Sequence, residues 1–167
     1  MSLAEIAARA AEITDERELA QLRQAVDEEL EGAARSADFR ERAVAFRAVG
    51  QMRFRQKTEL LRRGLEDESP ACRGSALLSL ELLSRDHAGV VNAVRSLLHQ
   101  LANADSNQAV RRLAVLALKN GSPHADTIVL LDHIADADDE ERELRQTAQR
   151  VADGLRKKSR ARGARSR

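Results

Sequence analysis

Apolar residues recur along the chain at spacings of three and four, the pattern of a helix with one buried face. One such stretch places its apolar residues at Val110, Leu113, Ala114, Leu116 and Ala117. It ends before Asn120-Gly121, a pair typical of a helix C-terminus. Ser122-Pro123 is expected to open the next helix, because proline is favoured in a first turn.

The same design is found upstream. Ser69 is expected to cap a helix with Pro70 in its first turn. Asp86 is expected to cap a single, longer partner helix, whose apolar residues are Val90, Val91, Val94, Leu97, Leu98 and Leu101. Residues 2–12 and 15–34 read as two further helices. Together these segments predict an all-α fold.

Two sequence markers repeat with one common period. The first is an arginine with alanine three positions later and an apolar residue just before it, at Arg40, Arg73, Arg111 and Arg145. These arginines are 33, 38 and 34 residues apart. The second is a Leu-Leu pair at residues 60–61, 97–98 and 130–131. Two interleaved markers with one period indicate repeated helical hairpins.

This pattern of an acidic loop, an apolar residue, arginine and a small residue resembles the HEAT-repeat family. Within that family it is similar to the short prokaryotic, phycobilin-lyase-type repeats. The resemblance covers about residues 37–155 and implies a right-handed α-solenoid of stacked antiparallel helical hairpins. It also implies a structural ladder in which loop aspartates pair with arginines of the next helix. Asp67 before Arg73 and Asp105 before Arg111 fit that role, with Arg40 and Arg145 at equivalent positions.

The expected organisation has three parts. Residues 1–36 form an N-terminal helical cap, because they lack the arginine marker. Residues 37–155 form the HEAT-like repeats, with units at 37–68, 69–105 and 106–137 and a half-repeat at 138–155. Residues 156–167, rich in Arg, Ser and Gly, are expected to be a disordered basic tail.

Composition indicates the cellular compartment of the protein. The single cysteine, Cys72, cannot form an intramolecular disulfide, which favours a reducing compartment. The first residues lack a signal-peptide pattern, and no stretch has the roughly 18 to 20 apolar residues of a membrane span. We therefore expect a cytoplasmic protein with no membrane contact.

Charge is unevenly distributed. Residues 156–167 hold seven basic and no acidic side chains, a charge of +7. Since the whole chain has a net charge of +1, residues 1–155 carry −6. The basic residues Arg156, Lys157, Lys158, Arg160 and Arg162 are candidates for nonspecific contact with nucleic acid phosphates. No Trp or Tyr is present to stack on a base. The alternative is a tail that only aids solubility.

Polar pairs follow the repeated leucines of the second helices. They are Arg62-Arg63, His99-Gln100 and Asp132-His133. In stacked hairpins such pairs would lie in one row on the concave face and would recognise a partner protein. A solvated helix face is the simpler explanation of the same pattern.

Catalytic and metal-binding patterns are weak. The four histidines include no His-x-x-x-His pair, so we expect no metal site and no cofactor. Cys72 reads as a core residue, and the acidic run 136–141 reads as favourable charge at a helix N-terminus.

The sequence thus predicts a non-enzymatic scaffold or adaptor that binds a partner protein of unknown identity. A nucleic-acid-associated protein that contacts phosphates through its C-terminus is the alternative. A lyase or isomerase acting on a bound cofactor is a third class, implied by the family resemblance alone.

Overall fold

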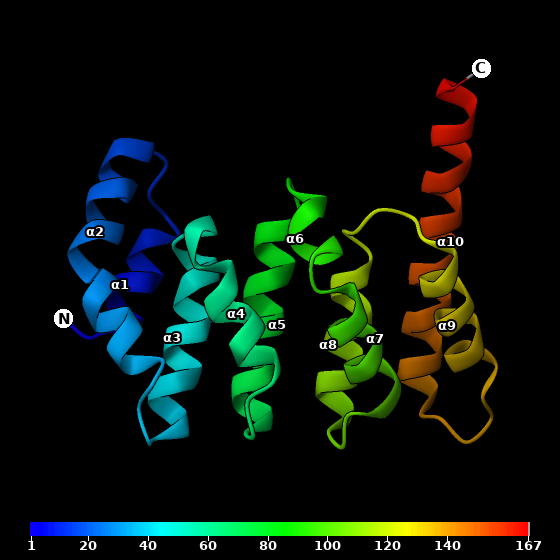
Figure 1. The fold of residues 1–167 in the computed structure, drawn as a ribbon, viewed down its shortest axis with the longest axis horizontal. Helices are drawn as coiled ribbons and strands as arrows, with labels where there is room; N and C mark the ends of the chain where they lie inside the picture. Colours follow the sequence, from blue (N-terminus) through cyan, green and yellow to red (C-terminus); the bar gives the residue numbers. More distant parts are fainter. Residues whose placement is uncertain (167) are drawn as a thin grey trace. The chain divides into compact units, whose positions relative to one another are not determined.

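The computed structural model describes residues 1–166, which hold ten α-helices, one short 3₁₀ helix and no strand (Figure 1). The all-helical prediction is therefore confirmed for this part of the chain. The chain divides into two compact units, Met1–Leu83 and Ser84–Arg167. We call them unit 1 and unit 2.

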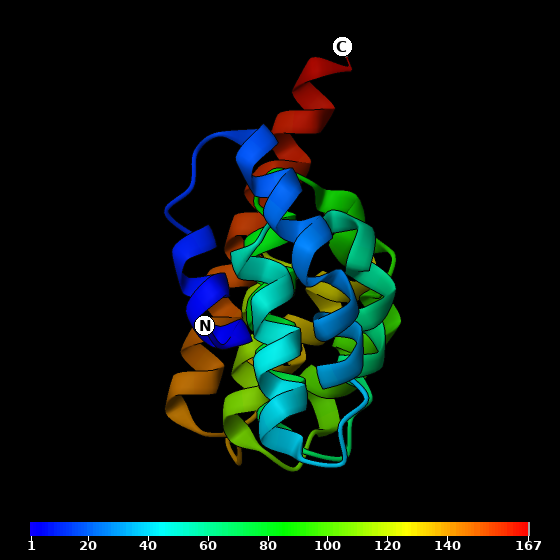
Figure 2. The ribbon, with the colours of Figure 1, turned by 90° about the vertical axis from the view of Figure 1, so that its left-hand side faces the viewer.

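Unit 1 is built from helices that surround α3. Its elements are α1 (Leu3–Ala10), α2 (Glu16–Ala33), α3 (Phe39–Gln51), η1 (Arg55–Lys57), α4 (Thr58–Leu65) and most of α5 (Pro70–Ser84). Both α1 and α2 pack against α3 (Figure 2). Burial of leucine, alanine and phenylalanine side chains between these helices drives their association.

The N-termini of these helices form where the sequence places capping residues. The Ser2 hydroxyl accepts from the Glu5 N–H while the Glu5 carboxylate accepts from the Ser2 N–H, which completes a capping box. Asp15 accepts two backbone N–H bonds at the start of α2, and Asp38 accepts one at the start of α3. The two predicted N-terminal helices are confirmed, with ends shifted by only a few residues.

Helices α3 and α5 approach closely at Gly50. A Cβ atom on Gly50 would lie 2.5 Å from the Cα of Ser79, so only glycine fits this crossing. The Gly50 N–H donates to Ser79 Oγ at 2.9 Å, and that hydroxyl donates to the Phe46 carbonyl at 2.5 Å. Since Ser79 is fully buried, these bonds satisfy a polar group inside the core.

Unit 2 contains α6 (Ala88–Asn92), α7 (Arg95–Ala104), α8 (Gln108–Leu118), α9 (Ala125–Asp136) and α10 (Arg142–Arg165). Helix α7 packs against α8, and α10 packs against both α8 and α9. Fully buried leucines from α7, α9 and α10 form the centre of this core, namely Leu98, Leu131 and Leu144.

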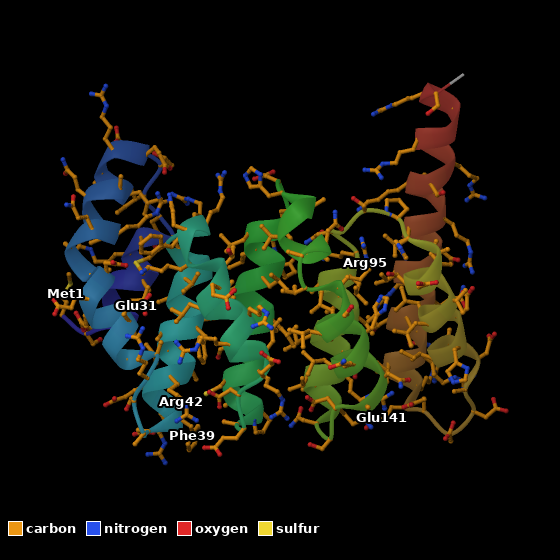
Figure 3. All side chains as sticks on the ribbon, in the orientation of Figure 1. Met1, Glu31, Phe39, Arg42, Arg95 and Glu141 are labelled. Atoms are coloured by element: carbon orange, nitrogen blue, oxygen red, sulfur yellow. The ribbon has the colours of Figure 1, made fainter. Side chains whose placement is uncertain are left out.

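The predicted single helix after Asp86 is wrong, because it is broken between α6 and α7. A polar cluster holds the break. The Asn92 amide oxygen accepts from the Ser122 N–H at 2.9 Å and from Arg95. Arg95, labelled in Figure 3, is the residue that begins α7. The predicted opening of the next helix at Ser122-Pro123 is also two residues early. Helix α9 begins at Ala125, after His124, whose ring nitrogen accepts from the Asp126 N–H.

The predicted disorder after residue 155 is wrong for residues 156–165, where α10 continues without interruption (Figure 1). Arginine, lysine and alanine are strong helix formers, and no proline interrupts them. The residues that suggested a disordered tail therefore form an exposed helix. Arg167 lies outside the described residues.

Candidate functional site

Four arginines occupy the same helical position, the fourth residue of α3, α5, α8 and α10. They are Arg42, Arg73, Arg111 and Arg145. Each donates from its guanidinium to one or two backbone carbonyls at or just after the end of the preceding helix. The acceptors are Ser36 and Ala37, Asp67 and Glu68, Ala102, and Ala135, in that order. Such bonds satisfy carbonyls that a helix end leaves without a partner.

Two of these arginines also bind a carboxylate through two parallel hydrogen bonds. Arg42 donates to Asp67 at 2.9 and 3.0 Å, and Arg111 donates to Glu140 at 2.7 and 2.6 Å. Both acids lie in the loop that follows the arginine's own hairpin. The guanidinium therefore joins the end of one helical segment to the start of another.

The paired carboxylates have lowered pKa values. Burial raises the pKa of Asp67, but hydrogen bonds from Arg42 and from the Ser69 N–H outweigh it. The pKa of Glu140 lies below its usual value mainly because its carboxylate accepts from Arg111. Both acids are consequently held in the charged form.

The predicted ladder is wrong in two respects. Arg40 does not take the place assigned to it: it is the second residue of α3, and its guanidinium lies 5.6 Å from the centre of the Phe39 ring. The carboxylate of Asp67 binds Arg42, while Arg73 bonds to the Asp67 backbone. The marker misled because Phe39 resembles the buried apolar residue that precedes the other arginines, although Phe39 is 44% exposed.

The second predicted pair, Asp105 with Arg111, is also different. Arg111 binds Glu140, not Asp105, whose carboxylate accepts from the Asn107 N–H at 2.9 Å just before α8. Arg145 has an acid nearby, with its guanidinium 3.7 Å from Asp138. For Arg42 and Arg111 the acidic partner thus lies in the loop after the arginine's own hairpin, whereas Asp138 precedes the helix of Arg145.

The polar pairs on the second helices have equivalent surroundings. Each pair directly follows a fully buried leucine, Leu61, Leu98 or Leu131. The second member of every pair is exposed to solvent: Arg63 on α4, Gln100 on α7 and His133 on α9. These three side chains form what we call the second-helix set.

The first members of the pairs are engaged within their own units. His99 is half-buried and its ring nitrogen bonds the Thr127 hydroxyl of α9 at 2.8 Å. Burial lowers the pKa of His99, and the charge of Arg95 lowers it further. The carboxylate of Asp132 pairs with Arg156 of α10. These side chains therefore serve contacts between helices of unit 2.

Arg62 and Arg63 differ in surroundings. Arg62 forms exposed ion pairs with Glu59 and Glu66 on its own helix, at 3.5 and 3.7 Å. Arg63 lines a hollow of about 580 Å³ in unit 1, together with Arg42 and Asp67. Among the described residues Arg62 shares its charge with two acids and Arg63 with none, so the charge of Arg63 is the more available to a partner.

The end of α10 is strongly basic. Residues 156–165 contain six basic side chains and no acidic one, and every residue from 157 to 165 is exposed. This part of the helix continues beyond α9 in Figure 1. Arg156 is tied to Asp132 and Asp153, whereas Lys158 donates to the Lys119 carbonyl oxygen of α8.

Cys72 and the histidines offer little chemistry. The Cys72 thiol is fully buried and donates to the Phe39 carbonyl at 3.2 Å. Burial raises the pKa of this thiol, which disfavours the reactive thiolate. Within residues 1–166, no three His, Cys, Asp or Glu side chains are grouped closely enough to hold a metal ion.

Comparison with known proteins adds no relationship: no family model matches this chain, and none of the curated proteins compared with it matches significantly. Among the helices of residues 1–166, none combines the length and apolar character needed to cross a membrane.

Sequence reasoning missed Arg150 and Lys119. Both line a hollow between α8 and α10 that also includes Lys158. The spacing of eight between Arg150 and Lys158 places them on one face of a helix. That signal was hidden because the helix was expected to end before residue 156.

Proposed function

We propose that the protein is a non-enzymatic, HEAT-like scaffold that binds a partner protein through exposed residues of its second helices. The supporting observation is the second-helix set: Arg63, Gln100 and His133 are each exposed two residues after a fully buried leucine. The buried leucine fixes the helix orientation, so the side chain after its neighbour must face solvent. Solenoid stacking would then align the three side chains along one surface.

The repeated arginine position also supports the HEAT-like part of this proposal. Four helices carry arginine as their fourth residue, and each arginine bonds to the end of the preceding helix. The recurrence of one capping device at intervals of 31, 38 and 34 residues is typical of duplicated hairpins.

Site-specific photo-crosslinking in cells of the source organism tests the proposal. A photoreactive residue placed in turn at Arg63, Gln100 and His133 should yield one common crosslinked protein. Gln149, which is exposed on α10, is the matched control position. Charge reversal at Arg62 and Arg63 should weaken capture of the same protein, whereas deletion of residues 156–167 should leave it intact.

The scaffold proposal fails if the three positions give no common product. It fails equally if Gln149 gives the same product with the same yield, since the second helices would then have no special role.

A second candidate function is nonspecific contact with nucleic acid, favoured by the five exposed basic residues of 157–165. Each cation that neutralises a phosphate releases a counterion, so affinity should fall steeply with salt. Binding of a mixed-sequence oligonucleotide should weaken when Arg160, Arg162 and Arg165 are all changed to Gln. It should persist when all three are changed to Lys, which keeps the charge.

A mobility-shift titration at two salt concentrations measures this effect. Absence of a shift at low salt, or equal binding by the Gln and Lys variants, would exclude the basic end of α10 as a nucleic-acid contact.

A further inference from the structure

A hollow of about 440 Å³ lies between the end of α8 and one face of α10 in unit 2. Its volume falls within the range of about 300 to 1,000 Å³ typical of small-molecule sites. Apolar side chains contribute part of the lining, and three cationic residues share it. The apolar residues are Leu116, Val151 and Leu155, and the cationic ones are Lys119, Arg150 and Lys158.

The spacing of the lining residues explains how the hollow forms. Thr147, Arg150, Val151, Gly154, Leu155 and Lys158 recur at intervals of three and one along α10. This is the stripe that a helix presents to its neighbour. A side chain is missing in the middle of the stripe, at Gly154.

Gly154 has no packing reason to be glycine. A Cβ atom at this position would meet no other heavy atom within 4 Å, in contrast to Gly50, where it would clash. Glycine inside a helix is destabilising relative to alanine. Glycine at position 154 thus leaves space in the middle of the stripe that lines the hollow.

The charged side chains among the lining residues of the hollow are cationic. None of its described lining residues is acidic. The pKa of Lys158 lies below that of an ordinary lysine, because desolvation and the positive charges of Arg162 and Lys119 disfavour its charged form. Lys158 donates one N–H to the Lys119 carbonyl oxygen, and an ammonium group has three donors in all.

Arg150 is placed to bind an anion at the same hollow. The one side-chain acceptor of Arg150 among the described residues is the Thr147 hydroxyl of its own helix, at 3.3 Å. A guanidinium has five donors and suits the planar or tetrahedral oxygens of carboxylate and phosphate. Arg150 and Lys158 lie two turns apart, on either side of Gly154.

We propose that the hollow between α8 and α10 binds a phosphate group carried on an apolar body. The phosphate is held by Arg150 and Lys158, and the apolar body lies over Gly154 against Leu116, the least buried apolar side chain of the lining. This site goes beyond the proposed scaffold function and does not depend on it. An anion there offsets the crowding of positive charge, and the apolar body removes the surface of the hollow from water.

Octyl phosphate, at concentrations below its micelle formation, is the direct probe. Isothermal titration calorimetry should show it binding at least tenfold more tightly than inorganic phosphate, since each buried methylene strengthens binding by about fourfold. Octyl glucoside, which has the same chain and no charge, should not compete. Lys158→Gln should weaken octyl phosphate binding about tenfold.

Variants at two glycines of α10 distinguish a loss of binding at the hollow from a general effect of the substitution on helix stability. Gly154→Leu should abolish octyl phosphate binding by filling the hollow, while Gly154→Ala should raise the Tm and weaken binding. Gly163, also in α10 and also facing open space, lies outside the hollow. Gly163→Leu and Gly163→Ala should leave binding unchanged. Circular dichroism of each variant confirms that it remains helical.

Two further arms identify the source of the ligand. Cosedimentation with phosphatidic acid vesicles, lost in Gly154→Leu and absent with phosphatidylcholine, would assign the site to a lipid headgroup. Binding of octyl phosphate without cosedimentation would assign it to a freely diffusing phosphate ester. Either result supports the site.

Three results would overturn the site proposal. One is no measurable binding of octyl phosphate. Another is equal binding by wild type and Gly154→Leu. The third concerns a mixed-sequence oligonucleotide. If it displaces octyl phosphate from wild type and binds Gly154→Leu as tightly as it binds wild type, the cations serve nucleic acid alone. Failure of the crosslinking experiment on the second helices would leave these results unaffected.

Discussion

The two halves of α10 are one continuous helix with different sources of stability. In residues 142–155, the side chains of Leu144, Ala148 and Leu155 are almost fully buried against α8 and α9. In residues 156–165 nearly every side chain is exposed and the charges all have one sign. The first half is held by packing. The second half relies on helix propensity and on a few contacts of Arg156 and Lys158, against repulsion between like charges.

The largest expected effect lies in the packed half. Leu144→Ala removes a fully buried side chain and should lower the free energy of unfolding by about 3 kcal/mol. The control is Arg160→Ala in the exposed half, which should change the free energy of unfolding by less than about 0.5 kcal/mol. Urea denaturation followed by circular dichroism measures both. Comparable losses in the two variants would mean that the halves do not differ as described.

The second effect concerns the loop that leads into the packed half. Arg111→Met should lower the free energy of unfolding by about 2 kcal/mol, because Glu140 loses both hydrogen bonds and remains largely covered. Arg145→Met is the matched control, since Arg145 has the same helical position. Its contact with an acid, Asp138, is longer, at 3.7 Å. A smaller loss in Arg145→Met is expected in the same urea titration, and an equal or larger loss would contradict the role given to Glu140.

Acid should weaken the same contact. The pKa of Glu140 is lowered in the folded state from an ordinary value of 4.5, mainly by the bond from Arg111. Its stabilising contribution is therefore complete above pH 4.5 and is lost as the pH falls through the lower, folded-state pKa. Urea midpoints of wild type and Glu140→Gln between pH 6 and pH 2.5 should converge on acidification. A difference that stays constant with pH would show that Glu140 does not titrate in this way.

The smallest effect lies in the exposed half. Arg156 and Arg160 are four residues apart on α10 and repel one another, so Arg160→Glu should stabilise the local helix by a few tenths of a kcal/mol. Slower amide hydrogen exchange at residues 157–165 is the expected observation. Arg160→Gln should give an intermediate rate. Faster exchange in Arg160→Glu would mean that repulsion is not what limits this segment.

Much of the fold could be predicted because its signals are local. Asp15 and Asp38 cap helices that begin one residue later, and Pro70 begins α5 as its sequence suggested. The break between α6 and α7 could not be predicted, since it depends on Asn92 bonding to Ser122, thirty residues away. The spacing of apolar residues depends on neighbours along the chain and carries no information on hydrogen bonds between residues far apart in sequence.

The candidate site was less predictable than the fold. The polar pairs on the second helices were found from the repeat, but their roles were not. His99 and Asp132 turned out to bond Thr127 and Arg156 within unit 2. Exposure separates such residues from Gln100 and His133, and exposure depends on how helices pack. The ladder failed for a similar reason, because two arginines stand two positions apart in α3 and only Arg42 faces Asp67.

The arginine at the fourth position of α3 and α8 has a consequence for how the chain folds during synthesis. Its bonds to the preceding helix end join residues 5 to 9 positions apart, so they are available as soon as the arginine is made. The carboxylates of Asp67 and Glu140 are made 25 and 29 residues later. Each newly made hairpin can therefore form the arginine–carbonyl bonds first. The arginine–carboxylate bonds follow when the next loop has been synthesised. These segments can therefore assemble from the N-terminus onward, because each arginine donor is synthesised before its carboxylate acceptor.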